Sequence, residues 1–557
     1  MNISNDFFNL FYRLKIFSIK IIQSGINFFF LFHFRTIKFK KYQYFSDKSA
    51  LGKKNKIYIF EMFGFNENII ANFFWSIALK KYLKAEVYCY PVKINNLYNP
   101  LTYKIYKLLG FKMINYYLLP KQEQKILNFY KKINFQNFTK KSFLKFKFCN
   151  TQIGDLINDH YIKFYKKITS DFNDKNFKKT LIDGLRVTLF WNDFFKKKNV
   201  YSIGYSHTPY LIGIPGRVAV NFNIHSLNIC GNNVVRINKK FLYFFDQFYK
   251  AKKAFSRFLK INFYKRKNIL SLSQIYLKKR MSGNLDYDNL PYFYKKTFNL
   301  KNIKFFKKKK LIEINKSNFN ILIAAHDFYE GPNTEGLFIF SDYYEWIKYL
   351  INFSINCNEN YKWFLKPHPD TGDEQIKILK DLLIVNKNIV LLPLETPNIY
   401  LIKSGIKFVL TNHGTIAAEF AYYNIPSLLC SESNIYSNFK FAIKSKNLND
   451  YESKLKLLNT YKIKINRNEV LEFFYIKKFL YEKINEQAFF NSSVYNENPI
   501  INYDKRQFKD NIDIIDDVYL KFYKNPHLLD MINSNIIKFL KKKYLIQFSG
   551  DDKAFWY

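Results

Sequence analysis

Short apolar runs alternate with amphipathic segments from about residue 56 onward. Residues 57–60 form an apolar run, residues 68–83 repeat apolar side chains at helical spacing, and residues 85–90 form a second run that stops at Pro91. Apolar runs bounded by loops are typical of buried strands, and the repeat between them predicts a helix. Strand, helix and strand in this order predict the start of a parallel α/β sheet.

A second series of the same kind follows between residues 180 and 237. The pattern predicts a helix over 181–195, a strand over 200–205, a helix through Arg217 and Ala219, and a strand near Ile224. This series extends the first predicted sheet.

The second half of the chain alternates more regularly, with short loops between the segments. This regularity predicts a doubly wound parallel sheet. The expected strands are 319–325, 361–365, 389–392, 407–410 and 425–430, and the expected helices are 342–353, 374–385, 398–404 and 416–423.

The chain therefore divides into two α/β domains with extensions, as its length of 557 residues also suggests. A lysine-rich, poorly periodic segment separates the domains, and a terminal helix is expected over 533–544. The predicted parts are a basic aromatic N-terminal extension (1–50), an N-terminal Rossmann-like domain (51–240), a lysine-rich helical connection (241–310), a C-terminal Rossmann-like domain (311–490) and a C-terminal helical extension (491–557).

Composition supports a globular protein, because 48% of the residues are hydrophobic and 24% are charged. The five cysteines are odd in number and far apart, and none of their spacings suits a metal site, so a reducing compartment is expected. The net charge of +45 raises the question of nucleic acid. The lysine runs are scattered along the chain, however, and the lysines accompany many Asn, Ile, Phe and Tyr, as A/T-rich codons would produce. We therefore disfavour a nucleic-acid partner.

The N-terminal extension has two interpretations. Its longest early uncharged run, residues 21–34, falls short of the roughly 20 apolar residues that span a bilayer, and no secretory cleavage site follows it. The basic and phenylalanine-rich residues 1–50 could contact a membrane surface, or they could form a helix packed on the domain. We expect a cytoplasmic protein that is either free or peripheral on the inner face of the membrane.

Three of the eight histidines follow predicted strands of the second domain, namely His326, His368 and His413. Ligands of parallel α/β sheets bind beyond the carboxyl ends of the strands, where these side chains would meet. Lys366 ends one of the same strands. The pattern predicts one shared site rather than three unrelated histidines.

The neighbouring residues suit a phosphate-bearing ligand. Gly414 would let the backbone approach closely, and Thr415 could cap the following helix, whose free N–H groups attract anions. Lys366 or His368 could neutralise charge on a departing phosphate. Glu419 could accept hydrogen bonds from ribose hydroxyls, or it could be a structural carboxylate.

These segments resemble the donor half of GT-B glycosyltransferases, and within them the capsule and surface-polysaccharide biosynthesis group. The resemblance lies in 366–369, 412–419 and 424–426, in 325–328 with 340–346, and in the first half in 153–159, 206–210 and 214–219. Asn158 departs from it, since an aromatic residue is expected there.

The resemblance implies two Rossmann-like domains facing a cleft, with metal-independent transfer of a sugar from a nucleotide donor. The N-terminal domain (51–240) would bind the acceptor, and the C-terminal domain (311–490) would bind the nucleotide sugar. UDP- and CMP-linked donors are both compatible, no further cofactor is expected, and the acceptor would be a growing surface glycan of the capsule or lipopolysaccharide type, free or lipid-linked. The only Asp-x-Asp sequence, at 286–288, lies in the irregular connection, where we interpret it as a turn.

Glycosyl transfer with inversion needs a base for the acceptor hydroxyl. Asp155 and His207 are the predicted catalytic candidates, with Glu61 as a further base or an acceptor-binding group. Arg217 could hold an anionic acceptor, although a surface ion pair would explain it nearly as well, and His207 could simply be a turn histidine.

Three other functions stay open. A nucleotide-sugar 2-epimerase or a polyol-phosphate transferase could use the same scaffold. A protein of another class, a non-catalytic membrane-surface protein of polysaccharide assembly, could use the basic N-terminus to dock.

Overall fold

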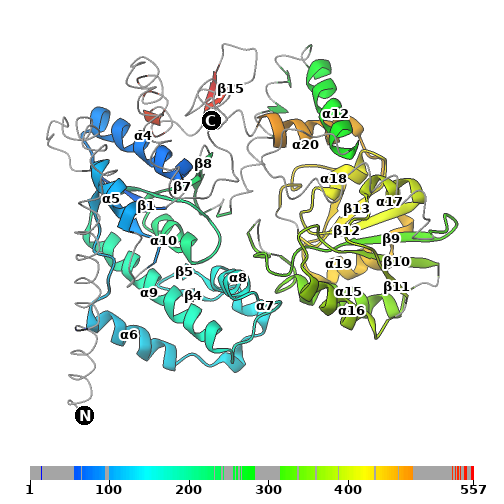
Figure 1. Ribbon diagram of the computed structural model, residues 1–557, viewed down its shortest axis with the longest axis horizontal. Helices are drawn as coiled ribbons and strands as arrows, with labels where there is room; N and C mark the ends of the chain where they lie inside the picture. The colour runs from blue at the N-terminus through cyan, green and yellow to red at the C-terminus, as the bar shows by residue number, and fades with distance from the viewer. Residues whose placement is uncertain are drawn as a thin grey trace. The chain divides into compact units, whose positions relative to one another are not determined.

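The computed structural model describes residues 56–243, 252–282 and 314–480 with short gaps, together with Leu14 and parts of 530–556. The chain forms two compact units (Figure 1). The first comprises residues 1–157, 172–244 and 482–557, and the second comprises 158–171 and 245–481. The C-terminal segment thus belongs with the first unit, and residues 158–171 belong with the second.

The sheet of the first unit has six strands in the order β3-β2-β1-β6-β7-β8. All neighbours pair in parallel except β7 and β8, which are antiparallel. The strand order reverses direction between β1 and β6, which makes that gap the topological switch point. The strands are β1 (Ile57–Met62), β2 (Glu86–Pro91), β3 (Lys112–Met113), β6 (Val200–Tyr205), β7 (His225–Cys230) and β8 (Asn233–Ile237).

Helices connect these strands, and a short antiparallel hairpin lies outside the main sheet. Helix α4 packs on the sheet through the buried residues Ile69, Phe74 and Ala78. The helices are α4 (Asn66–Leu83), α5 (Pro100–Leu108), α6 (Pro120–Lys131), α7 (Lys140–Phe143), α8 (Gly154–Tyr165), α9 (Lys175–Lys197) and α10 (Ile214–Asn221), and the hairpin is β4 (Lys147–Phe148) with β5 (Thr151–Gln152). Only the first four residues of α8 belong to this unit, since residues 158–171 belong with the second.

The C-terminal segment contributes to the core of the first unit. Ile536, Ile537 and Leu540 are buried in the same apolar cluster as Phe74 of α4. These residues lie within the expected terminal helix 533–544, and the positions of that segment that the structure describes are helical. Strands β15 (Leu545–Gln547) and β16 (Ala554–Trp556) then form an antiparallel pair.

The sheet of the second unit is parallel throughout, with the order β11-β10-β9-β12-β13-β14. This is the strand order of a Rossmann fold, with the switch point between β9 and β12. The strands are β9 (Phe319–Ala324), β10 (Tyr361–Lys366), β11 (Ile389–Leu391), β12 (Ile406–Thr411), β13 (Ser427–Leu429) and β14 (Ala442–Lys444), and the helices are α12 (Arg266–Ser282), α15 (Tyr343–Ile355), α16 (Asp373–Leu383), α17 (Asn398–Ser404), α18 (Ile416–Ala421), α19 (Leu448–Lys456) and α20 (Arg467–Phe474).

The sequence of β9 explains why this sheet is covered on both faces. Side chains alternate between the faces of a strand. Ile321 and Ile323 pack in one apolar cluster with α15 and α16, whereas Leu322 and Ala324 pack in another with α17 and α18 (Figure 1). Because both faces of β9 are buried, apolar side chains are needed on both of them, as in other parallel sheets.

The predicted fold class is confirmed: the protein is α/β, with two Rossmann-like units built on largely parallel sheets. Two sequence predictions fall outside the described residues, namely the turn at 286–288 and the membrane-contacting or packed helix within 1–50. Among the helices that the structure describes, none combines the length and apolarity required to span a bilayer.

Candidate functional site

The switch point of the second sheet lies between the ends of β9 and β12. His326 follows β9 by two residues, and Asn412 and His413 follow β12 directly. The neighbouring strand β10 ends at Lys366, with His368 two residues beyond. Parallel strands of this kind present their carboxyl ends at one edge of the sheet, which is the usual ligand-binding edge of the fold.

The structure brings the three imidazoles together, as the sequence predicted. The ring centroids of His326 and His413 are 4.4 Å apart, and those of His326 and His368 are 6.4 Å apart. His326 also stacks on Tyr343 of α15, with a centroid distance of 4.6 Å. The histidines therefore form one cluster, which we call the histidine cluster, with His326 at its centre.

Burial keeps this cluster uncharged at neutral pH. It lowers the pKa of His368 to about 4 and that of His413 to about 3, and the pKa of His326 lies well below its usual value for the same reason. Nearby positive charge on Lys477 adds to the shift of His413, and that on Lys366 to the shift of His368, although Asp327 opposes the latter.

Hydrogen bonds assign the tautomers of two of these rings. The side-chain amide of Asn412 donates to Nδ1 of His413 at 3.0 Å, and the backbone N–H of Asp370 donates to Nδ1 of His368 at 3.3 Å. A neutral imidazole that accepts at Nδ1 carries its proton on Nε2. Both rings therefore carry their proton on Nε2.

Lys366 is a buried cation beside this cluster. Its side chain is 4% exposed, and burial lowers its pKa to about 8, against the opposing influence of Glu419 and Glu395. Its ammonium forms no hydrogen bond or ion pair with any residue that the structure describes. A desolvated charge without such partners is unfavourable, and an anionic ligand would compensate it.

Glu419 is held by other residues. Its carboxylate accepts hydrogen bonds from Nε of Arg280 and from the side-chain amide of Asn398, both at 2.8 Å. Both oxygens thus have protein partners, as a structural carboxylate would, and the contact with ribose stays a prediction. The sequence analysis missed Arg280, since it lies in the poorly periodic connection.

The predicted cap of α18 by Thr415 is wrong. The Thr415 side chain forms no capping bond to the helix, and its Oγ1 instead accepts a hydrogen bond from Arg280 at 3.1 Å. The arginine reaches across from α12 and takes the hydroxyl that a cap would need. Thr415 therefore links α18 to α12 instead of closing the helix end.

Gly414 lies where a side chain would not fit without rearrangement. A Cβ at this position would be 2.9 Å from Oγ1 of Thr411 and 3.8 Å from Cε1 of His326. The backbone oxygen of Gly414 accepts a hydrogen bond from the hydroxyl of Tyr436 at 2.8 Å. This glycine thus lets the loop after β12 pack closely against the histidine cluster.

The switch point of the first sheet holds a second group of polar residues. The carboxylate of Glu61, in β1, accepts a 2.6 Å hydrogen bond from the backbone N–H of Ser206, which follows β6. Burial raises the pKa of Glu61 to about 7, although the bond from Ser206 opposes the shift. His207 lies beside it, with Nδ1 2.9 Å from Oγ of Ser206, and its pKa is lowered by burial.

Asp155 and Arg217, predicted respectively as base and acceptor group, bind each other. The guanidinium donates to both carboxylate oxygens, at 2.6 and 2.7 Å, and both side chains are buried. The hydroxyl of Tyr243 donates to the same carboxylate at 3.2 Å. The sequence analysis kept an ion pair as the alternative for Arg217 but expected it at the surface, whereas this pair is buried, with the two side chains 4% and 1% exposed.

Within the described residues, no three His, Cys, Asp or Glu side chains are grouped as a metal site would require. The metal-independence of the reaction stays a prediction.

No protein-family model and no curated protein matches the chain. Among solved structures, it is similar to the UDP-GlcNAc 2-epimerase from Neisseria meningitidis bound to UDP-GlcNAc, with 10% identity, 76% of this chain and 98% of that chain covered, and a TM-score of 0.24. It is also similar to the enzyme from Methanocaldococcus jannaschii in complex with UDP-GlcNAc and UDP, with 11% identity, coverages of 76% and 99%, and a TM-score of 0.25. Because the identities and TM-scores are so low, these similarities carry no functional argument. Any function has to be inferred from the residues of the site.

Proposed function

We propose that this protein acts on a nucleotide-activated sugar, and specifically that it is a glycosyltransferase of surface-polysaccharide synthesis. One observation carries the proposal: a histidine cluster and an unpaired buried lysine meet at the switch point of a Rossmann-like sheet. Convergent polar groups at this place in the fold are typical of nucleotide sites. The donor would be UDP- or CMP-linked, and the acceptor a growing or lipid-linked glycan.

In this proposal the second unit binds the leaving nucleotide. The ammonium of Lys366 offsets the negative charge that develops on the departing phosphate, and the Nε2–H groups of His368 and His413 donate hydrogen bonds to its oxygens. These donors are positioned before the ligand arrives, because His413 is held by Asn412 and His368 by the backbone of Asp370. Little reorganisation is then needed in the transition state.

The first unit would supply the base. Glu61 suits this role best, because a carboxyl with a pKa of about 7 is substantially ionised at neutral pH and still basic enough to accept a proton. His207 is the second candidate. Asp155 is less suitable, since Arg217 occupies both of its carboxylate oxygens.

The pH dependence tests the role of Glu61. If it is the base, turnover should rise as the pH increases through about 7, where its carboxyl loses its proton. Glu61→Gln should lower kcat by about 10²–10⁴-fold and abolish that rise. A variant with unchanged turnover and an unchanged pH profile would exclude Glu61, and the same measurement on His207→Asn would then test the second candidate.

Nucleotide binding tests the donor site directly. UDP or CMP should raise the melting temperature, because a ligand that binds only the folded state stabilises it by RT ln(1 + [L]/Kd). His368→Ala and His413→Ala should keep the melting temperature of the free protein but lose most of the shift. A full shift in both variants would contradict the donor-site assignment.

A 2-epimerase is the second candidate function, because a carboxyl with a pKa of about 7 could equally remove a proton from a sugar carbon. A polyol-phosphate transferase would use the same phosphate-binding groups. Product analysis separates these activities, since an epimerase converts the nucleotide sugar without an acceptor. A non-catalytic assembly protein would instead tolerate loss of the histidine cluster.

A further inference from the structure

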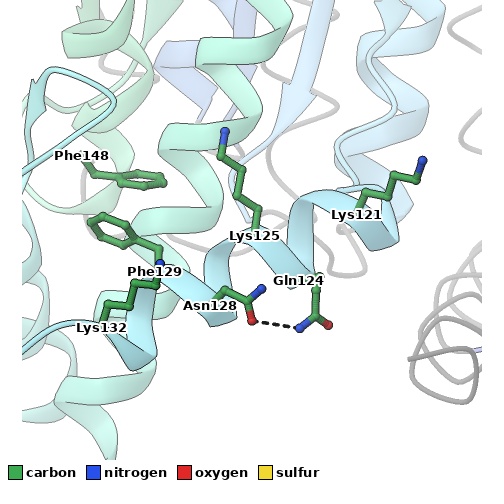
Figure 2. A pocket seen from close by; sticks show the side chains of 7 residues that line it. All are labelled: Lys121, Gln124, Lys125, Asn128, Phe129, Lys132 and Phe148. Carbon is green, nitrogen blue, oxygen red and sulfur yellow. Dashed lines mark hydrogen bonds between the residues drawn. The ribbon is translucent and has the colours of Figure 1, made fainter. Parts of the chain in front are cut away.

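A basic pocket lies on the first unit. Its lining residues are distant in sequence from the residues described at the two switch points. It has a volume of about 550 Å³ and is formed mainly by one helix, α6 (Figure 2). This volume falls in the range of small-molecule sites, roughly 300–1,000 Å³. Its lining residues are Lys121, Gln124, Lys125, Asn128, Phe129, Lys132 and Phe148.

The helical repeat explains why these side chains share a surface. Residues three or four apart lie on the same face of a helix, so Lys121, Lys125, Phe129 and Lys132 form one stripe. In Figure 2 the ring of Phe148, from β4, lies beside the ring of Phe129. The two ring centroids are 4.6 Å apart. The stripe thus combines cationic side chains with an aromatic pair.

The lysines of the pocket lack carboxylate partners. None of Lys121, Lys125 and Lys132 forms an ion pair with the residues that the structure describes. The carboxylate nearest to these lysines in sequence is that of Glu123. It pairs with Arg186 and lies on the buried side of the helix.

This arrangement is unfavourable for the helix alone. Lys121 and Lys125 are like charges at i and i+4, and Lys121 lies in the first turn, where the helix dipole favours negative charge. A bound anion would relieve both effects. The charge of the pocket therefore points to an anionic ligand.

We propose that the pocket is a binding subsite for an acidic glycan. The three lysines would bind its carboxylate or phosphate groups, the accessible edge of Phe129 would pack against the apolar face of a sugar ring, and Gln124 and Asn128 would bond to hydroxyls. The side chains of Gln124 and Asn128 bond to each other at 3.0 Å in the free protein. Only the identification of this glycan as the acceptor rests on the proposed function.

Direct binding tests the subsite without any catalytic step. Short polysialic acid oligosaccharides, as a carboxylate-bearing probe, should bind the full chain at low salt, and neutral maltohexaose should not. The triple variant K121A/K125A/K132A should weaken binding about tenfold or more, as expected for three exposed charge contacts. Phe129→Leu keeps an apolar side chain at this half-buried position but removes the aromatic ring, and it should also weaken binding.

A matched control separates the pocket from the general positive charge. K377A/K380A/K403A removes three exposed lysines of the second unit and lowers the net charge equally. It should leave glycan binding unchanged. Equal weakening in both triple variants would overturn the subsite, as would tighter binding of a single-stranded oligonucleotide or of anionic phospholipid vesicles at the same lysines.

The nucleotide-dependent thermal shift should be the same in the pocket variants as in the natural chain. If polysialic acid binds at the pocket while neither UDP nor CMP shifts the melting temperature, the subsite stands and the proposed function fails. If UDP or CMP shifts the melting temperature while polysialic acid does not bind, the donor site stands and the subsite is overturned.

Discussion

Arg217→Met is expected to lower the free energy of unfolding of the first unit by roughly 3–5 kcal/mol. The substitution leaves the buried carboxylate of Asp155 without the guanidinium that now donates to both of its oxygens. Among the described residues, the hydroxyl of Tyr243, at 3.2 Å, and the side-chain amide of Gln152, at 3.5 Å, would still donate to this carboxylate. Urea unfolding followed by a probe of the first unit measures the effect.

Two variants sharpen this test. The double variant D155L/R217M removes both charges and should recover much of the loss, because replacing a whole buried pair with apolar side chains is often nearly neutral. Lys112→Met removes an exposed ion pair with Glu86, in which the lysine side chain is 60% exposed. It should lower the free energy of unfolding by at most about 1 kcal/mol. If Arg217→Met cost no more than Lys112→Met, the ion pair would not have the structural role we assign to it.

Lys366→Met is expected to reduce turnover with a nucleotide-sugar donor by about 10²–10³-fold. Its ammonium is the buried positive charge beside the histidine cluster, so its loss removes stabilisation of the departing phosphate. The folded protein should be equally stable or more stable, because methionine avoids the burial of an unpaired charge. Steady-state kinetics and thermal melting of the same sample measure both effects.

Lys362→Met is the matched control, since Lys362 lies on the same strand but is exposed. It should leave turnover and melting temperature unchanged. Full turnover in Lys366→Met would remove the lysine from the mechanism. A large drop in melting temperature would show that Lys366 stabilises the fold through contacts that its burial alone does not indicate.

Local sequence patterns determined much of the fold. Residues 321–324 of β9 are all apolar, and the amphipathic repeat of α15 begins one residue after its N-cap, Asp342. Such elements are specified by period-2 and period-3.6 patterns within a few residues of each other. Strand β14 was not predicted, because only three apolar residues, 441–443, stand between Lys440 and Lys444, whereas the equally short strands β11 and β13 lie in longer apolar runs.

The sequence by itself also placed three histidines and Lys366 near one edge of a sheet, because the carboxyl ends of parallel strands must meet there. Only the tertiary structure decided which groups remain available to a ligand. Asp155 pairs with a residue 62 positions away, and Glu419 with one 139 positions away. Periodicity reports only on near neighbours in the chain, whereas the partner of a buried charge is set by how distant elements pack.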